Sequence, residues 1–311
     1  MKYLSNYKNI FIVTTAMMAV VFSFTGCNSN STGTDKTALA PVTNLKAFSV
    51  SDTSVGLTWT PSAKEGVSEF AEYTITAKKA NGDITASTSA SAGDTSYTVL
   101  SLTEGVIYTF EIVVTATDGA KEYKNSGAVS VKWSPSRRLN TEGGSSLPIK
   151  VYETSSVIGG SGLILYRTAV SGPLAVSIIG ADSNDVDLYA KTEPNNSISF
   201  ISFHLYHAGS GKHITRFSSV VRNAASLDDP QLMPPDTGTY SPAHSAITID
   251  SLNISSSKIF YFKSNNGNYG RILVQANGNS LLWGTSPDQY LNLKISYQTA
   301  AYNPYSKTKH P

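Results

Sequence analysis

The sequence predicts an all-β protein, because short apolar segments with a two-residue alternation recur along most of the chain. Turn residues separate these segments at intervals of about ten residues, as in antiparallel sandwiches. No long amphipathic helix pattern and no tandem repeat interrupts them. Of the 311 residues, 40% are hydrophobic, enough to bury about two apolar cores. Charged residues make up only 15%, while Ser, Thr, Asn and Gly are abundant, as is typical of extracellular β proteins.

The N-terminus has the three parts of a secretory signal, which we expect to span residues 1–26. Lys2 and Lys8 supply positive charge, and residues 10–24 form an apolar stretch shorter than the about 20 residues of a transmembrane helix. Cys27, the only cysteine in the chain, follows directly. A single cysteine cannot form an internal disulfide, so stability must come from apolar cores.

The segment Phe24-Thr25-Gly26-Cys27 resembles the lipobox of bacterial lipoproteins, although that family prefers Leu where Phe24 stands. The resemblance implies that Cys27 carries a lipid such as palmitate and anchors the protein in a membrane of the cell envelope. Asn28 follows the cysteine, which resembles lipoproteins of the Gram-negative outer membrane and implies a periplasmic or surface-exposed protein. The alternative is an ordinary signal peptide with an incidental cysteine.

Shifts in composition divide the rest of the chain into five parts. Residues 27–40 are rich in Ser, Thr, Asn and Gly, so we expect a flexible tether. Two strand-rich units, 41–134 and 147–302, are joined by a polar, turn-rich linker at 135–146 and followed by a polar tail at 303–311. The formal charge is +2, and removal of the two signal lysines brings the chain near neutrality, so nucleic acid is not an expected partner.

The first unit has the strand spacing of an antiparallel sandwich. It contains a Pro-Val-x-x-Leu opening at 41–45, then a strand around Trp59, and later a run from Leu102 to Tyr108. These segments, in this order, resemble a fibronectin type III domain. The resemblance implies a tyrosine corner, in which the Tyr108 hydroxyl bonds to nearby backbone, and structural roles for Trp59, Leu102 and Tyr108. Glu104 replaces the usual proline. The family implies a module for spacing or binding, here without an Arg-Gly-Asp integrin motif.

The second unit predicts a larger antiparallel sandwich or jelly roll from eleven short strands and no convincing helix. Asn266-Gly267 and Asn277-Gly278 predict hairpin turns, as Asn81-Gly82 does in the first unit. The proline-stiffened segment 222–245 either folds over the sandwich to shape a binding face or is a decorated surface loop. Residues 260–274 and 291–297 resemble β domains of uncharacterised bacterial envelope lipoproteins. The predicted strands are 149–152, 163–168, 174–179, 186–190, 198–206, 214–221, 246–252, 258–263, 271–275, 280–283 and 291–298.

Two polar clusters contain residue types that bind metals. Histidines three residues apart on a strand, such as His204 and His207, point to opposite faces and cannot both ligate one ion unless a bulge intervenes. A crowded acidic turn can hold calcium, but the EF-hand spacing is absent. We therefore expect turn-forming acids and solvent-facing histidines, and neither a metal nor a cofactor. The weak metal candidates are Asp182, Asp185, Asp187, His207 and His213.

The chain carries no G-x-S-x-G elbow, H-E-x-x-H motif or P-loop, and the turn Gly159-Gly160-Ser161-Gly162 precedes no helix that could form an anion site. Surface aromatic rings stack on sugars and anchor protein interfaces. We expect non-catalytic binding of a glycan or a protein, as in adhesion. The alternatives are a hydrolase-like envelope enzyme with its site on the second unit, and a structural spacer. The candidate ligand-binding aromatics are Tyr206, Tyr240, Tyr269 and Trp283, with Trp283 better suited to a core.

Overall fold

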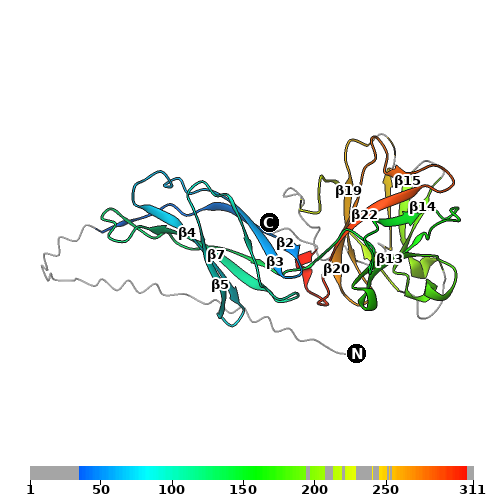
Figure 1. Ribbon diagram of the computed structural model, residues 1–311, viewed down its shortest axis with the longest axis horizontal. Coiled ribbons are helices and arrows are strands. Elements are labelled where there is room, and N and C mark those ends of the chain that lie inside the picture. The colour runs from blue at the N-terminus through cyan, green and yellow to red at the C-terminus, as the bar shows by residue number, and fades with distance from the viewer. Residues whose placement is uncertain are drawn as a thin grey trace, which may run out of the picture. The chain divides into compact units, whose positions relative to one another are not determined.

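Hydrogen-bonded β-sheets form both units of the computed structural model, and the predicted all-β fold class is confirmed (Figure 1). Cys27, the signal segment and His207 lie outside the described residues. Within the described ranges, no helix has the length and apolar character needed to cross a bilayer. The structure describes residues 35–193, 197–206, 213–218, 221–228, 240, 245–250, 252 and 254–306.

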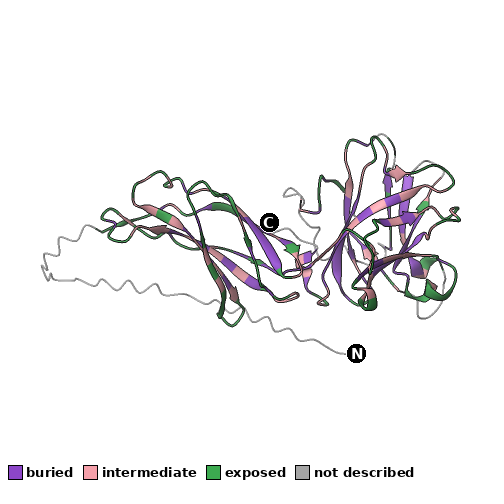
Figure 2. Cartoon of the chain, in the orientation of Figure 1, coloured by how far each residue is buried: buried purple, intermediate pink, exposed green. Residues whose placement is uncertain are grey.

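The first unit is a sandwich of two sheets whose inner faces share one apolar core. One sheet runs β2 (Thr43–Ser51), β3 (Ser54–Thr60), β6 (Ser96–Val99), and the other runs β5 (Ile84–Ala90), β4 (Phe70–Lys79), β7 (Tyr108–Ala116), β9 (Val129–Trp133). Every second residue in the middle of β4 and along β7 is buried, as the period of a strand requires (Figure 2). Asn81-Gly82 turns β4 into β5, and Gly82 has a φ of 90°, which glycine adopts without strain.

Tyr108 fixes the crossover between the two sheets of this sandwich. Its side chain is buried, and its hydroxyl accepts a hydrogen bond from the backbone N–H of Thr103 at 3.1 Å. Leu102 is buried beside it, and its N–H bonds to the carbonyl of Thr53. This geometry is the tyrosine corner that the family resemblance implies. In the same core, the ring of Trp59 packs edge-on against another buried tyrosine.

The second unit is also a sandwich, with a five-stranded and an eight-stranded sheet around a shared apolar core. The smaller sheet runs β13 (Gly172–Val176), β12 (Gly162–Arg167), β14 (Leu188–Thr192), β15 (Ser197–Ser202), β18 (Ala246–Asp250). The larger runs β10 (Arg137–Leu139), β22 (Tyr290–Tyr297), β20 (Tyr269–Val274), β19 (Lys258–Lys263), β16 (Arg216–Phe217); β11 (Ile149–Tyr152) and β21 (Leu282–Trp283) pair with β22, and β17 (Arg222–Asn223) pairs with β19. Phe200 and Phe260, one from each sheet, meet with ring centroids 4.8 Å apart.

Predicted and observed elements of the second unit differ mainly where strands are short. The prediction for residues 258–263 coincides with β19, whereas the prediction for 214–221 exceeds the two residues of β16. Asn266-Gly267 forms the expected hairpin turn between β19 and β20. Asn277-Gly278 instead forms a local turn closed by a bridge between Asn277 and Ser280, because β21 pairs with β22 rather than with β20.

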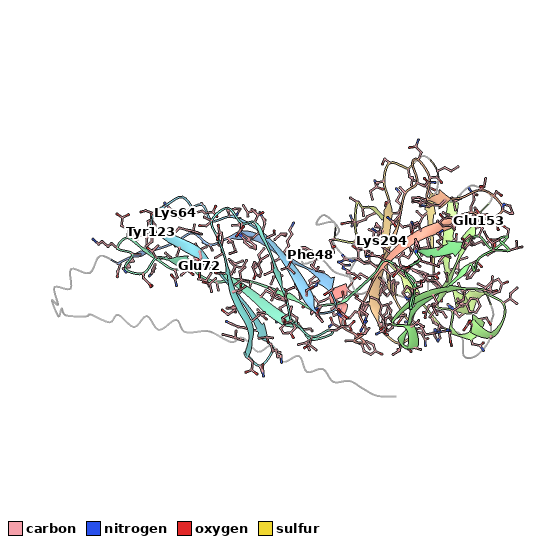
Figure 3. All side chains as sticks on the ribbon, viewed as in Figure 1. Phe48, Lys64, Glu72, Tyr123, Glu153 and Lys294 are labelled. Carbon is pink, nitrogen blue, oxygen red and sulfur yellow. The ribbon has the colours of Figure 1, made fainter. Side chains whose placement is uncertain are left out.

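The N-terminal tether ends earlier than its composition predicts. β1 (Thr37–Ala38) pairs in parallel with β8 (Tyr123–Lys124), and Leu39 is buried in the first core. At this end of the sandwich the Lys64 ammonium lies 5.6 Å from the ring centroid of Tyr123 (Figure 3). Residues 37–39 therefore belong to the first sandwich. Backbone pairing with β8 holds them there, and the composition of the segment does not predict this pairing.

The predicted linker at 135–146 is likewise part of the folded structure. Its β10 pairs antiparallel with β22, so the second sheet begins before the boundary expected at residue 147. Arg137 donates from Nε to both carboxylate oxygens of Glu104 at 3.1 Å, so the residue that replaces the family's proline pairs with a β10 arginine. Within the compact unit of residues 36–311, noncovalent contacts such as the Arg137–Glu104 pair thus join the two sandwiches in addition to the covalent connection between β9 and β10.

The polar C-terminal segment also packs against the first sandwich. Asn303 donates from Nδ2 to the carbonyl of Gly105 at 3.0 Å, and Tyr305 packs edge-on against Trp133 with ring centroids 5.5 Å apart. Nearby, the indole Nε1 of Trp133 donates to the buried hydroxyl of Ser49 at 2.9 Å. The expectation of a free tail is corrected for residues 303–306, because polar side chains bury well where each finds a hydrogen-bond partner.

A cationic cluster lies on the face of the larger sheet that points away from its core. Tyr261 of β19, Arg271 of β20 and Ser296 of β22 lie opposite one another in register, and all three are buried. Arg138 of β10 is the next member of this row, since it pairs with Ser296. Arg138 forms an ion pair with Asp228, and Nη2 of Arg271 lies 3.6 Å from the same carboxylate. Burial lowers the pKa of Arg271 to about 10, so the side chain stays charged at neutral pH.

The described parts of the segment 222–245 cover this outer face. Ala224 and Leu227 form a buried apolar cluster with Ile259 and Leu273 of the sheet. Tyr240 packs against Tyr269, with ring centroids 5.6 Å apart. These residues follow the expectation that the segment folds over the sandwich, and the remainder of the segment lies outside the described residues.

We predict that Asp228→Asn lowers the free energy of unfolding by about 3 kcal/mol, because it leaves two buried guanidinium groups without their shared counter-charge. Urea denaturation followed by tryptophan fluorescence measures the change. Asp182→Asn is the matched control, since it removes an exposed ion pair with Arg167 and is expected to cost less than about 1 kcal/mol. Equal losses in the two variants would contradict the structural role of Asp228.

Candidate ligand-binding site

A cleft with a volume of about 430 Å³ lies among the loops of the second sandwich. The loop between β11 and β12, the loop after β13 and residues on and after β14 form its walls. We call it the loop cleft. Its lining includes four serine or threonine residues, one lysine and two tyrosines. These residues are Thr154, Ser156, Ser161, Ser177, Lys191, Tyr189 and Tyr206.

Close backbone packing positions the β11–β12 loop. A Cβ atom at Gly159 would collide with the ring of Tyr152, and one at Gly160 would collide with the backbone of Val176. Both positions therefore require glycine, and the N–H of Tyr152 bonds to the carbonyl of Gly160 at 2.9 Å. Asp288 holds the opposite part of the loop by accepting from Ser156 Oγ at 2.8 Å. The Gly-rich run noted in the sequence thus has its role in close packing.

Tyr206 presents the most accessible aromatic ring of the loop cleft, with 41% of the residue exposed. It follows the short 3-10 helix Phe203–Leu205, stacks on Phe203 at 5.7 Å and meets Tyr189 edge-on at 5.2 Å. These contacts hold the Tyr206 ring in a fixed orientation. A fixed and exposed ring provides a flat apolar face that loses little conformational entropy when a ligand stacks on it.

Exposed apolar side chains lie on the same loops that form the loop cleft. Val157 and Ile158 lie on the β11–β12 loop, and Ile179 lies on the loop after β13. They are 90%, 67% and 73% exposed. A contiguous group of exposed apolar side chains can mark an interaction surface, and loops often carry such surfaces.

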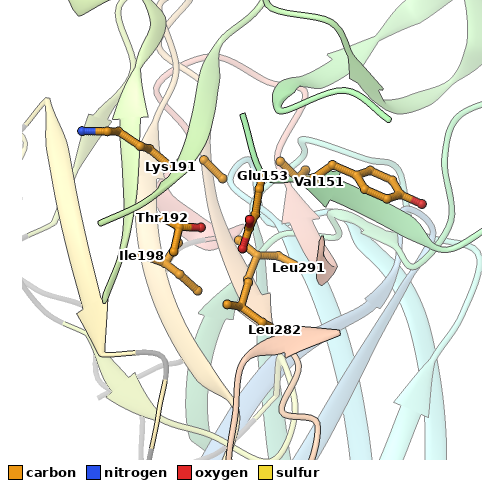
Figure 4. Close-up of a pocket in the computed structure, with 9 residues that line it drawn as sticks. Val151, Glu153, Lys191, Thr192, Ile198, Leu282 and Leu291 are labelled. Carbon is orange, nitrogen blue, oxygen red and sulfur yellow. The ribbon is translucent and has the colours of Figure 1, made fainter. Parts of the chain in front are cut away.

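The chemistry of the loop cleft is that of hydrogen bonding and stacking. Its lining offers hydroxyl donors and acceptors and the ammonium of Lys191, which also contacts Glu193 at 3.1 Å. The half-buried Glu153 does not line this cleft; with Thr192 and Leu291 it lines a separate gap of about 10 Å³ (Figure 4). Such a gap admits at most about one water molecule, so it is too small to hold a ligand.

The structure separates the four aromatic residues that the sequence grouped as ligand-binding candidates. Tyr206 is exposed at the loop cleft, but Tyr240 and Tyr269 are buried against Tyr261 and offer no face to a ligand. Trp283 is half-buried, and its indole N–H donates to the carbonyl of Gln275 at 3.1 Å. The expectation for Tyr240 and Tyr269 is therefore corrected, because Tyr240 packs on the sheet face that carries Tyr261 and Tyr269 and both rings are buried there.

The acidic turn uses its carboxylates internally. Asp182 and Asp185 both accept from Nη2 of Arg167, at 2.9 and 3.0 Å. Asp187 is buried, accepts from the N–H of Leu165 at 2.8 Å, and pairs with Nδ1 of His213 at 2.9 Å. Among the described residues, no group of three or more His, Cys, Asp or Glu side chains is arranged to hold a metal ion.

The two described histidines of this region have opposite environments. The hydrogen bond to Asp187, together with the charges of Asp187 and Asp185, raises the pKa of His213, against the opposing effect of burial. Burial, and then the charge of Arg216, lowers the pKa of His204. His204 Nδ1 lies 2.7 Å from the Ser202 hydroxyl, so it contacts a different partner from His213 and the two do not converge.

Comparison with known proteins assigns the class of the first unit. Residues 40–132 match the family described as Fibronectin type III domain. The two-sheet sandwich and tyrosine corner agree with this match, so this part of the chain is a fibronectin type III domain.

Two of the solved structures that are similar to part of the chain are domains named fn3 or FN5. The fn3 domain of human collagen alpha-1(XX) chain is 22% identical, with a TM-score of 0.28, and the match covers 38% of this chain and 99% of that one. The FN5 domain of Drosophila Lar is 19% identical, with a TM-score of 0.23, and covers 32% and 98% respectively. No curated protein matches the chain.

We predict that His213 titrates above about 6.5, its usual value, and His204 below it, as NMR titration of the two imidazoles would show. Because the folded pKa of His213 is raised, its contribution to stability is complete below the unfolded pKa. That contribution is lost as the pH rises through the folded pKa. His213→Gln should therefore lower the free energy of unfolding by roughly 0.5–1 kcal/mol near pH 5.5 and by less near pH 8.5. A loss that is larger at the higher pH would contradict the pair with Asp187.

Proposed function

We propose that this protein is a lipid-anchored cell-envelope protein whose second sandwich binds a glycan in the loop cleft, without catalysis, while the fibronectin type III domain serves as a spacer. The observation that carries the proposal is the combination of four hydroxyl side chains, Lys191 and the exposed ring of Tyr206 in one cleft. Its volume of about 430 Å³ lies within the range of small-ligand sites.

A sugar ring has the complementary chemistry. Its C–H face stacks on an aromatic ring, and its hydroxyl groups exchange hydrogen bonds with serine, threonine and lysine side chains. The loop cleft has low charge, which suits a ligand whose polar groups are neutral hydroxyls. Hydrolysis of a glycosidic bond uses two facing carboxylates, and the described lining of this cleft contributes none. These features support binding as the activity.

A protein partner is the second candidate, and the exposed apolar side chains around the cleft favour it. Val157, Ile158 and Ile179 are the kind of residue that becomes buried at the centre of a protein interface. Pull-down from envelope extracts with the soluble mature chain distinguishes the two candidates. A partner that is lost in Val157→Asp but retained in Tyr206→Ala would replace the glycan proposal.

We predict that Tyr206→Ala weakens glycan binding by about tenfold, since a stacking aromatic ring contributes about 1–1.5 kcal/mol beyond its area. A glycan array identifies the ligand, and calorimetry of wild type and variant measures the change. Tyr123→Ala is the matched control, because Tyr123 lies in the fibronectin type III domain away from the loop cleft. Unchanged affinity in Tyr206→Ala, or no glycan bound by the wild type, would refute the proposed site.

The anchor has its own test, because Cys27 lies outside the described residues. We predict that an alkyne fatty acid labels the wild-type protein in cells and fails to label Cys27→Ala. The reason is that the lipobox resemblance makes the Cys27 thiol the site of acylation. Membrane fractionation of the same two strains gives an independent readout. Equal labelling of both proteins would refute the lipid anchor while leaving the glycan proposal intact.

A further inference from the structure

A second, smaller pocket lies where β16 meets the β19–β20 hairpin. Its volume is about 150 Å³, the space that about five water molecules occupy in the liquid. We call it the β16 pocket. The residues that matter in its lining are Arg216, Lys263, Ser264, Asn265, Gly267 and Tyr302. It shares no lining residue with the loop cleft.

Two positive charges face each other across this pocket. Arg216 of β16 is the direct antiparallel partner of Lys263 of β19, so the two side chains project from the same face of the sheet. Like charges directly opposite each other in a sheet are destabilising. The next residue in register beyond Lys263 is Tyr269, which offers no charge to offset them.

Neither cation is neutralised by a carboxylate. Among the described residues, no Asp or Glu oxygen lies within 4.0 Å of the charged groups of Arg216 or Lys263. The Nε of Arg216 is buried and finds no hydrogen-bond acceptor in that part of the chain. A buried guanidinium N–H without an acceptor is costly, because it has lost its water.

The ammonium of Lys263 is held in place by aromatic rings. Its Nζ lies 5.3 Å from the ring centroid of Tyr269 and 5.2 Å from that of Tyr302. Tyr302 is fixed against the hairpin turn, since its N–H bonds to the carbonyl of Gly267 at 2.9 Å. Gly267 has a φ of 81°, and a Cβ there would lie 3.0 Å from the Tyr302 ring. The two tyrosine rings therefore position the ammonium of Lys263 without neutralising its positive charge.

We propose that the β16 pocket binds a small oxyanion, the carboxylate, sulfate or phosphate group of a ligand, between Arg216 and Lys263. A guanidinium fork matches two oxygens of such a group, and the ammonium supplies a third donor. An anion placed there removes the repulsion between the two side chains and gives the buried Nε an acceptor. This inference is independent of glycan binding in the loop cleft.

The test uses the soluble mature chain and three probes, sodium sulfate, inorganic phosphate and glucuronate, with chloride added to keep the ionic strength constant. NMR chemical shifts and thermal unfolding report binding. The wild type is expected to saturate with at least one probe and to melt at higher temperature in its presence. Arg216→Gln is expected to weaken binding about tenfold or more, and Arg216→Lys is expected to recover part of the loss. Glucose is the neutral comparison for glucuronate.

Lys132→Gln is the matched control, since it removes one exposed positive charge from the fibronectin type III domain. Lys263→Gln provides a second variant within the pocket in case Arg216→Gln does not fold. The proposal is supported if saturation is lost in the pocket variants and retained in Lys132→Gln. It is overturned if no probe saturates the wild type, or if all variants bind equally. The probe that binds best identifies whether the group is a carboxylate, a sulfate or a phosphate.

Discussion

Two arginines that lie against the carboxylate of Asp228 link three parts of the chain, in addition to the apolar packing of Leu227 on the sheet and the pairing of β10 with β22. Arg271 belongs to the centre of the larger sheet, Arg138 to its edge strand β10, and Asp228 to the segment after β17. The Nε of Arg138 also donates to the carbonyl of Ser49 in the fibronectin type III domain at 2.7 Å. Removing one partner of a buried ion pair is strongly destabilising, because the remaining charge is left without compensation, so the cluster favours the arrangement of strands that keeps Asp228 beside the two arginines.

This constraint decides which surfaces remain open to ligands. A two-layer sandwich usually exposes the outer faces of its sheets, but here the outer face of the larger sheet is covered by Ala224, Leu227 and Tyr240. The two candidate sites of the second sandwich lie where loops or strand ends meet the sheets. The loop cleft and the β16 pocket both lie at such places, one lined by hydroxyl groups and the other by opposed cations.

The sequence predicts those features whose causes are local. Alternating apolar residues indicate the strands, and Asn-Gly pairs indicate the tight turns at residues 81–82 and 266–267. It fails for β10, whose Arg137-Arg138-Leu139 has no alternation and becomes a strand because β22 offers it backbone partners. The burial of Tyr269 and the convergence of Ser156 with Ser177 depend on contacts between distant segments. Hydroxyl residues are so abundant in this chain that their local pattern does not distinguish a cleft from a surface.

The three residues of β10 have a mechanical consequence. The chain crosses only once from the first sandwich to the second, between Trp133 and Arg137, and β10 begins at that crossing. If the N-terminus is anchored and the second sandwich holds a ligand, tension between them passes through this single strand. The contacts of Asn303 and Tyr305 with the first sandwich form a second connection between the two sandwiches, which bears tension together with β10. The returning C-terminal segment therefore shares the load, and the junction resists extension as a group of bonds rather than as one strand peeled from its sheet.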